Sequence, residues 1–153
     1  MLFLLFQLGN DRYALEVGQV AEVLPLLSLK QIPQAPPAVA GVFDFRGEPV
    51  PVVDLSQMAL GRPARSRLST RIILAHYPDG NGEQRLLGLI AERVTETIRR
   101  DPQDFAASGV DLDAAPYLGP VATDGRGLIQ RVDVDQLLTS AVRDLLFQQP
   151  VAS

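Results

Sequence analysis

Central to this sequence is the stretch Gly41-Val-Phe-Asp-Phe-Arg-Gly-Glu-Pro-Val-Pro-Val-Val-Asp-Leu55. Val42–Phe45 and Val50–Val53 are rich in β-branched and aromatic residues, which favour strands. The intervening Arg46–Pro49 contains glycine and proline, the residue types that most strongly mark turns. The pattern predicts a β-hairpin that is followed at once by a helix.

The tip of this hairpin carries an arginine. Because Gly47 tolerates a positive φ, we expect Arg46 to face solvent, where its five donors suit a carboxylate. A local ion pair of Arg46 with Asp44 or Glu48 is an equally good interpretation of the spacing. Upstream, Pro33–Gly41 holds three prolines and a glycine that can end a short helical turn, so we expect a stiff entry into the hairpin.

Outside this stretch the chain has many short strand patterns and one strong helical pattern. Turn-forming residues at 9–11 and 78–82 predict two further hairpins, with strands at 2–8 and 12–17, and at 71–77 and 84–90. The strand pattern resumes over 94–99. Apolar residues at helical spacing predict a C-terminal helix with one apolar stripe: Val134, Leu137, Leu138, Val142, Leu145 and Leu146.

An internal repeat predicts two similar halves. Residues 14–24 align with residues 88–98, and the identical pairs are Leu15 with Leu89, Val20 with Val94, and Glu22 with Glu96. Arg46-Gly47 and Arg126-Gly127 each precede a strand that ends at an aspartate. Those aspartates, Asp54 and Asp133, have a glutamine three residues later, which is the spacing of a capping box. The repeat therefore favours two small β-barrels with capped helices.

Composition narrows the class of protein. The chain has 153 residues, no cysteine and a formal charge of −4, with Lys30 as its only lysine. These values predict one domain without disulfides or thiolate metal sites, and they argue against nucleic acid as a partner. Met1–Phe6 is apolar but too short to span a bilayer and lacks a basic flank, so we expect a buried strand and a cytoplasmic protein.

Catalytic patterns are sparse. His76 is the only histidine, and it lies at the end of a predicted strand without a cysteine for a nucleophile pair. The run Asp79–Glu83 lacks the length of an EF-hand loop, so a hairpin turn is the better interpretation. Asp111 and Asp113 could form an acid pair, although carboxylates in a polar loop are usually solvated. We expect no cofactor, no metal and no enzymatic activity.

Taken together, several ordered motifs make the sequence resemble the CheW family, the coupling proteins of bacterial chemosensory arrays. The motifs are Phe6–Gly9, Tyr13, Val20–Val23, the Pro-Pro segment, Gly41–Gly47, Val50–Leu55, Gly88–Val94, Tyr117–Gly119 and Leu128–Leu138. The resemblance implies a mostly β fold of two SH3-like five-stranded β-barrel subdomains packed around a shared core, with short helices and a C-terminal helix. It also implies a single domain over residues 1–148, followed by a frayed tail at 149–153.

The resemblance also implies partners and contact residues. A groove between the subdomains would take the cytoplasmic tip of a chemoreceptor, and barrel ends would pack against the regulatory domain of a CheA-type histidine kinase. Homologous adaptors are further candidate partners, and direct membrane insertion is not expected. Carried over position by position, the residues that contact or shape the partner surface are Val20, Glu22, Gly41, Arg46, Gly47, Val94 and Thr97.

The sequence departs from the family pattern near these positions. Phe43-Asp44-Phe45 is bulkier and more acidic than the family's usual residues before Arg-Gly, and Ala91-Glu92 replaces a usual Val-Asp pair. The main hypothesis is a non-enzymatic adaptor that is recruited to membrane-associated receptor arrays. The alternatives are an interaction module that does not activate a kinase, such as a decoy or array spacer, and a small hydrolase that uses Asp111 or Asp113 with His76.

Overall fold

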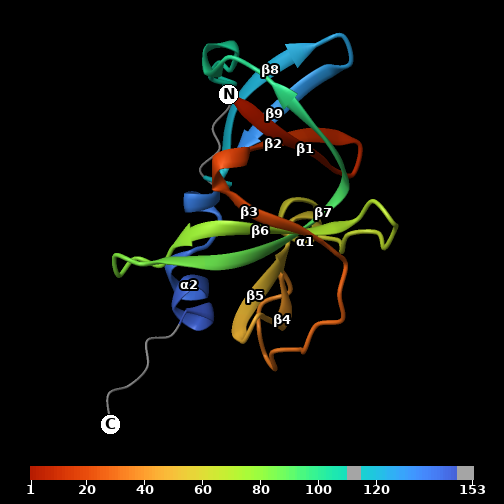
Figure 1. Ribbon diagram of the computed structural model, residues 1–153. Helices are drawn as coiled ribbons and strands as arrows, with labels where there is room; N and C mark the ends of the chain where they lie inside the picture. The colour runs from red at the N-terminus through yellow and green to blue at the C-terminus, as the bar shows by residue number, and fades with distance from the viewer. Residues whose placement is uncertain (110–114, 148–153) are drawn as a thin grey trace.

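The structure is a computed structural model that describes residues 1–109 and 115–147 (Figure 1). Its strands are β1 (Leu2–Leu8), β2 (Asp11–Glu16), β3 (Val20–Pro25), β4 (Val39–Phe45), β5 (Glu48–Asp54), β6 (Arg71–Pro78), β7 (Gln84–Arg99), β8 (Leu118–Asp124) and β9 (Gly127–Val132). Its helices are α1 (Leu55–Leu60) and α2 (Ser140–Leu146), with 3₁₀ turns η1 (Val17–Gln19), η2 (Pro102–Asp104) and η3 (Val134–Gln136). The expected mostly β fold is confirmed.

The strands form two curled sheets that share β7. The upper sheet in Figure 1 pairs β1 with β2, β2 with β9, and β9 with β8, while the C-terminal part of β7 flanks β1. The lower sheet pairs β3 with β6, β6 with the N-terminal part of β7, β7 with β5, and β5 with β4. Each sheet is an SH3-like unit of five strands, but the strand pairing does not close either one into a barrel.

The two halves of the sequence are interleaved in space. The upper sheet combines the first hairpin, β1 and β2, with β8, β9 and the end of β7. The lower sheet combines β3, β4 and β5 with the second half's first hairpin, β6 and the start of β7. The sheets correspond strand for strand, including a parallel pairing in each: β2 with β9 and β5 with β7. The sequence repeat therefore corresponds to a structural repeat, but neither half of the sequence forms one of the two sheets on its own.

The main core lies where the two sheets meet. The repeat residues Leu15 and Leu89 are both fully buried there, together with Tyr77 and Val53. Phe3 and Leu5 point to a second, smaller core in the upper sheet, beside Phe105. Residues of β1 are buried on both faces, Leu4 and Phe6 in the main core and Phe3 and Leu5 in the smaller one, which explains why Met1–Phe6 is apolar. Within the described residues no helix has the length and apolarity needed to cross a bilayer.

The predicted C-terminal helix is wrong in its extent. Helical spacing from Val134 to Leu146 is interrupted, because Asp133 caps only the 3₁₀ turn η3 and Thr139 then caps a separate α2. The Thr139 hydroxyl accepts from the backbone N–H of Val142 at 3.2 Å. Val134, Leu137, Leu138, Val142 and Leu146 still pack in or against the core, which is why the periodicity runs through the break, whereas Leu145 is exposed.

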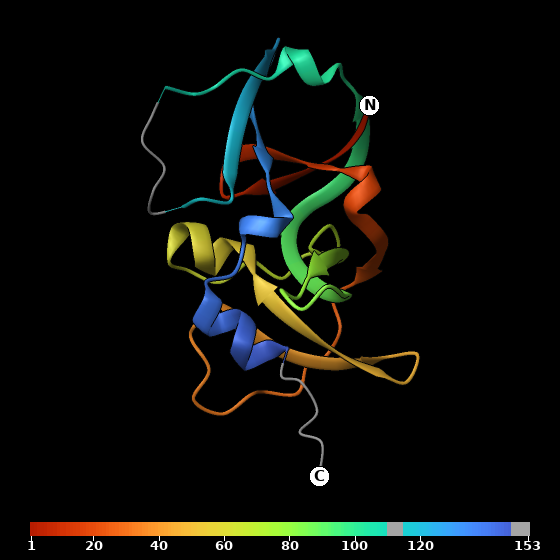
Figure 2. The same ribbon diagram turned by 90° about the vertical axis from the view of Figure 1, so that its left-hand side faces the viewer.

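α2 packs on the β6–β7 hairpin through aromatic and cationic side chains. The rings of Phe147 and Tyr77 stack with centroids 5.5 Å apart, and the Arg85 guanidinium lies 5.4 Å from the Phe147 centroid. In Figure 2, α2 lies on the same side of the molecule as α1. The predicted hairpin turn at Asp79 is confirmed, since its carboxylate accepts from the backbone N–H of Asn81 at 2.7 Å.

Candidate functional site

The tip between β4 and β5 is a two-residue turn that leaves an arginine in solvent. Arg46 and Gly47 have φ angles of 54° and 87°, the pair of positive values that defines the hairpin turn best matched to strand twist. The backbone N–H of Gly47 donates to Asp44 Oδ1 at 2.7 Å. The Arg46 side chain is 76% exposed, which confirms the predicted solvent-facing tip.

Arg46 pairs with a residue of another strand. Its guanidinium nitrogen lies 3.4 Å from Glu22 Oε2 on β3, and its carbon lies 4.7 Å from the centroid of the Phe45 ring. The alternative of a local pair with Asp44 or Glu48 is wrong, because the guanidinium pairs with Glu22 and the Asp44 carboxylate accepts from Gly47 instead. The Arg46–Glu22 pair thus joins the hairpin tip to β3, an edge strand of the lower sheet.

Val20 and Glu22 lie on this edge strand. Val20 is opposite Ala75 of β6, is half-buried and packs against the main core. A bulge between Val20 and Glu22 shifts the register of β3 on β6. Glu22 is consequently directed to the Arg46 tip. The strand therefore offers a half-buried apolar side chain next to an exposed ion pair.

Gly41 shapes the same region from inside β4. The prediction that this glycine ends a helical turn is wrong, because Gly41 is a buried strand residue with φ of 149° at a bulge. A Cβ at this position would lie 2.5 Å from the carbonyl oxygen of Lys30. Lys30 and Val42 exchange two backbone hydrogen bonds of 2.9 Å across it. Glycine is required here so that the segment before β4 can lie against the strand.

The second half repeats the ion pair but not the half-buried valine. Arg126 at the β8–β9 turn lies 3.3 Å from Glu96 on β7, as Arg46 does from Glu22. Val94, the counterpart of Val20, is 1% exposed and belongs to the main core, and its backbone N–H donates to the Ser69 carbonyl. The Val94 side chain therefore packs in the core and offers no surface to a partner. Thr97 is exposed on β7.

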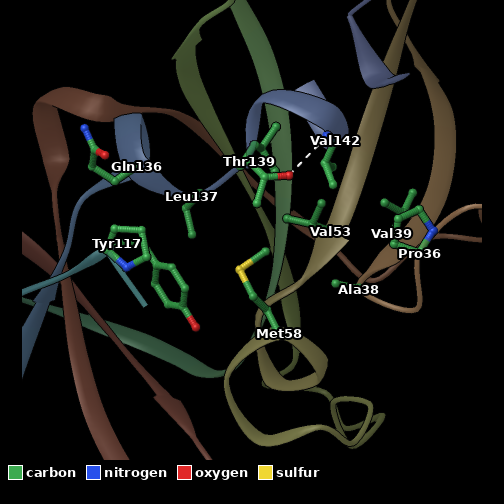
Figure 3. Close-up of a pocket in the computed structure, with 12 residues that line it drawn as sticks. Pro36, Ala38, Val39, Val53, Met58, Tyr117, Gln136, Leu137, Thr139 and Val142 are labelled. Carbon is green, nitrogen blue, oxygen red and sulfur yellow. Dashed lines mark hydrogen bonds between the residues drawn. The ribbon is translucent and has the colours of Figure 1, made fainter. Parts of the chain in front are cut away.

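A cavity between the two sheets lies elsewhere. It has a volume of about 300 Å³ and opens between α1, α2 and the chain before β4 (Figure 3). Its lining is mostly apolar and includes Val39, Val53, Met58, Leu137 and Val142. Neither Val20 nor Glu22 lines it. Sequence reasoning missed this cavity because its walls come from four segments that are distant along the chain.

The polar candidates have structural partners. The Asp54 carboxylate is buried and accepts from the backbone N–H groups of Ser56, Gln57 and Ala64, which confirms its predicted role as a cap. Asp133 accepts from Asp135 N at 3.1 Å. His76 is half-buried on β6, paired with Leu86. Asp111 and Asp113 lie outside the described residues. Within the described residues, no group of His, Asp or Glu is placed to hold a metal.

The strongest ion pair ties the ends of the upper sheet together. Arg12 on β2 donates to both carboxylate oxygens of Asp124, one at 2.8 Å, and also to the Gly127 carbonyl at 3.1 Å. These hydrogen bonds, followed by the backbone N–H of Arg126, hold the pKa of Asp124 well below its ordinary value. Burial raises the pKa of Tyr13, Tyr77 and Tyr117, so all three remain neutral phenols.

Comparison with known families agrees with this architecture. Residues 2–142 match the family described as the CheW-like domain. The chain belongs to this family. A chemotaxis protein CheW from Treponema pallidum is 26% identical over 137 residues, covering 88% of this chain and 80% of that protein. The CheW of Klebsiella aerogenes is 27% identical over 144 residues, covering 90% and 81%.

Two further similarities extend the comparison. Protein FrzA of Myxococcus xanthus is 29% identical over 142 residues, covering 91% of this chain and 86% of that protein. The solved structure of the scaffolding protein TtCheW from Thermoanaerobacter tengcongensis matches with a TM-score of 0.76, covering 88% of this chain and 84% of that chain at 24% identity. This structural match confirms the CheW-like fold of two SH3-like sheets.

Proposed function

We propose that this CheW-like protein is a non-enzymatic adaptor that couples a chemoreceptor to a CheA-type histidine kinase in a bacterial chemosensory array. Its place would be the cytoplasm, where membrane-associated receptors recruit it. The observation that carries the proposal is the Arg46–Glu22 pair, which holds an exposed guanidinium against β3, the strand that also carries the half-buried Val20. Membership of a family whose relatives are named chemotaxis proteins supports the same reading.

The geometry suits an exchange of partners at the hairpin tip. Exposed ion pairs contribute little to stability, typically 0.2 to about 1 kcal/mol. Arg46 can therefore leave Glu22 for a carboxylate of the partner at low cost. Val20 would supply the apolar contact that loses water on binding, with Glu22, Gly47 and Thr97 at the polar margin. Gly41 acts indirectly by shaping the strand behind the tip.

A charge-swap experiment separates a partner contact from an internal one. Arg46→Glu alone places two acids together, whereas Arg46→Glu with Glu22→Arg restores an internal pair in reverse. If Arg46 binds a partner carboxylate, the double variant should keep its melting temperature and still fail to bind. The measurement is pull-down of a receptor and of the kinase regulatory domain, with phosphate transfer followed in a reconstituted mixture.

Two outcomes would change the proposal. Full binding by the double variant would show that Arg46 serves only the internal pair. Wild-type protein that binds both partners without raising kinase activity would instead be a decoy or array spacer. Arg99→Gln, which removes an exposed charge elsewhere on β7, is the control for general electrostatic loss.

A further inference from the structure

A polar cavity lies where β7 leaves the lower sheet and joins the upper one. It has a volume of about 350 Å³, and Arg12, Ser69, Arg93, Thr95, Glu96 and Arg126 line it. The cavity exists because β7 bulges away from β1. Leu5 of β1 is opposite Glu96 and Gln7 is opposite Glu92, so one residue of β1 faces three residues of β7. The bulge is held open by a 3.0 Å hydrogen bond from Val94 N to the Ser69 carbonyl.

Arg93 stands at this bulge in an unfavourable backbone conformation. Its φ is 49°, in the left-handed region that glycine occupies without strain and that costs other residues about 1–2 kcal/mol. The side chain is exposed, and it makes no hydrogen bond or ion pair with any described residue. Arg12 and Arg126, by contrast, are matched by Asp124 and Glu96. One uncompensated arginine therefore faces the cavity at a position where glycine would stabilise the fold.

The loop beside the cavity adds positive charge and an exposed apolar side chain. Between Gly61 and Arg71 the sequence has three arginines and no acidic residue, although the whole chain has a formal charge of −4. Arg62 lies against Gly9 in the β1–β2 turn, on the right in Figure 1. Leu68, next to Ser69, is 99% exposed. The whole Leu68 side chain is therefore accessible to an apolar group of another molecule.

We propose that this cavity and the arginine-rich loop dock an acidic segment of a partner protein, with a carboxylate at Arg93 and an apolar side chain against Leu68. Charge complementarity selects an acidic occupant. The acid Glu96 in the cavity wall, and Asp124 paired with the wall residue Arg12, select a protein over a bilayer. An anionic membrane surface would repel these acids, whereas a partner chain can match a mixed pattern of charges. The surface is separate from the Arg46 tip, so the proposal stands independently of the adaptor function.

The test uses the full chain and a fluorescein-labelled peptide of four Glu-Leu repeats, with a Lys-Leu peptide as its opposite. Fluorescence anisotropy should show binding of the acidic peptide alone. Arg93→Gly should weaken that binding by roughly tenfold, through loss of a charged hydrogen bond. The same variant should melt at a higher temperature, because glycine relieves the left-handed strain. A loss of binding together with a gain in stability cannot come from damage to the fold.

Control variants distinguish binding at Arg93 from a general electrostatic attraction between the protein and the acidic peptide. Arg93→Gln and Arg99→Gln change the net charge equally, and only the first should weaken the peptide complex. Equal loss in both variants would overturn the proposal. It would also be overturned if inorganic phosphate competed as well as the peptide, or if phosphatidylglycerol vesicles bound the protein through Arg93 while the peptide did not. Leu68→Ser should reduce affinity for the Glu-Leu peptide and leave melting unchanged.

Discussion

At the scale of single residues, some contacts between distant segments of the chain depend on one glycine or one carboxylate. Gly41 lets the segment before β4 touch the strand, and Asp124 holds the end of the β8–β9 hairpin against β2 through Arg12. Each acts between segments that are far apart in sequence. Their effects on stability can be tested one residue at a time.

Gly41→Ala should destabilise the protein more than Gly47→Ala. Both glycines have positive φ, so each alanine carries a conformational cost of about 1–2 kcal/mol. A Cβ at Gly47 meets nothing within 4 Å, whereas a Cβ at Gly41 collides with the Lys30 carbonyl. Urea unfolding of the two variants gives the comparison. Equal losses would mean that the chain before β4 moves aside freely.

Stability should fall in acid through Asp124. Its pKa in the folded protein is lowered from 3.8, so the folded state favours the carboxylate. That contribution is complete above the unfolded value and is lost as the pH falls below about 4 toward the folded pKa. Asp124→Asn should flatten this part of the curve of melting temperature against pH. An unchanged acid slope in the variant would assign the effect to other carboxylates.

The sequence predicted the Arg46 tip but not its partner. Glu22 is 24 residues away from Arg46, and their contact depends on how β3 lies beside the hairpin. The repeat held an unused signal, because Glu22 and Glu96 align and each half has an arginine at its turn. Val94 shows that equivalent positions in a repeat need not be equally covered, because Val94 is buried in the main core while Val20 is half-buried.

At the scale of elements, the short helices are set by capping and packing rather than by their own propensity. α1 has six residues and α2 has seven, lengths at which an isolated helix is not stable in water. α1 begins at a buried aspartate, and α2 is fixed by Phe147 on Tyr77. Strands were easier to predict than these helices, because alternation and turn residues mark them directly.

Removal of the two caps should have unequal effects. Asp54 accepts three backbone hydrogen bonds in a buried setting, so Asp54→Ala should cost about 2–4 kcal/mol through the lost cap and the unsatisfied donors. Asp133 is exposed and its carboxylate accepts one hydrogen bond, from the backbone N–H of Asp135, so Asp133→Ala should cost about 0.5–1 kcal/mol. Chemical denaturation measures both. A larger loss at Asp133 would contradict the assigned hydrogen bonds.

At the scale of the whole molecule, neither half of the sequence contains a complete sheet. The upper sheet needs the first hairpin from one half and the last strands from the other, and the lower sheet needs the reverse. The sequence alone predicted two similar halves because their motifs recur. It could not show the exchange of hairpins, since exchanged and unexchanged arrangements bury the same residues.

Separated halves should therefore be unfolded alone and fold when mixed. The cut belongs beside the exposed Leu68, giving residues 1–67 and 68–153. Each fragment lacks two or three strands of every sheet it enters, so far-ultraviolet circular dichroism should show little strand content before mixing. An equimolar mixture should recover the spectrum of the intact chain. Independent folding of either fragment would contradict the interleaved topology.

The sixteen residues of β7 have a mechanical consequence. One continuous strand is clamped by β5 and β6 at one end and by β1 at the other. Tension along this strand would load its hydrogen-bond ladders in shear, so that many hydrogen bonds must break together. Strands that are pulled apart sideways from one end would instead lose these bonds one at a time. The protein should consequently behave as a stiff strut, and whatever it joins would be held at a constant spacing under load.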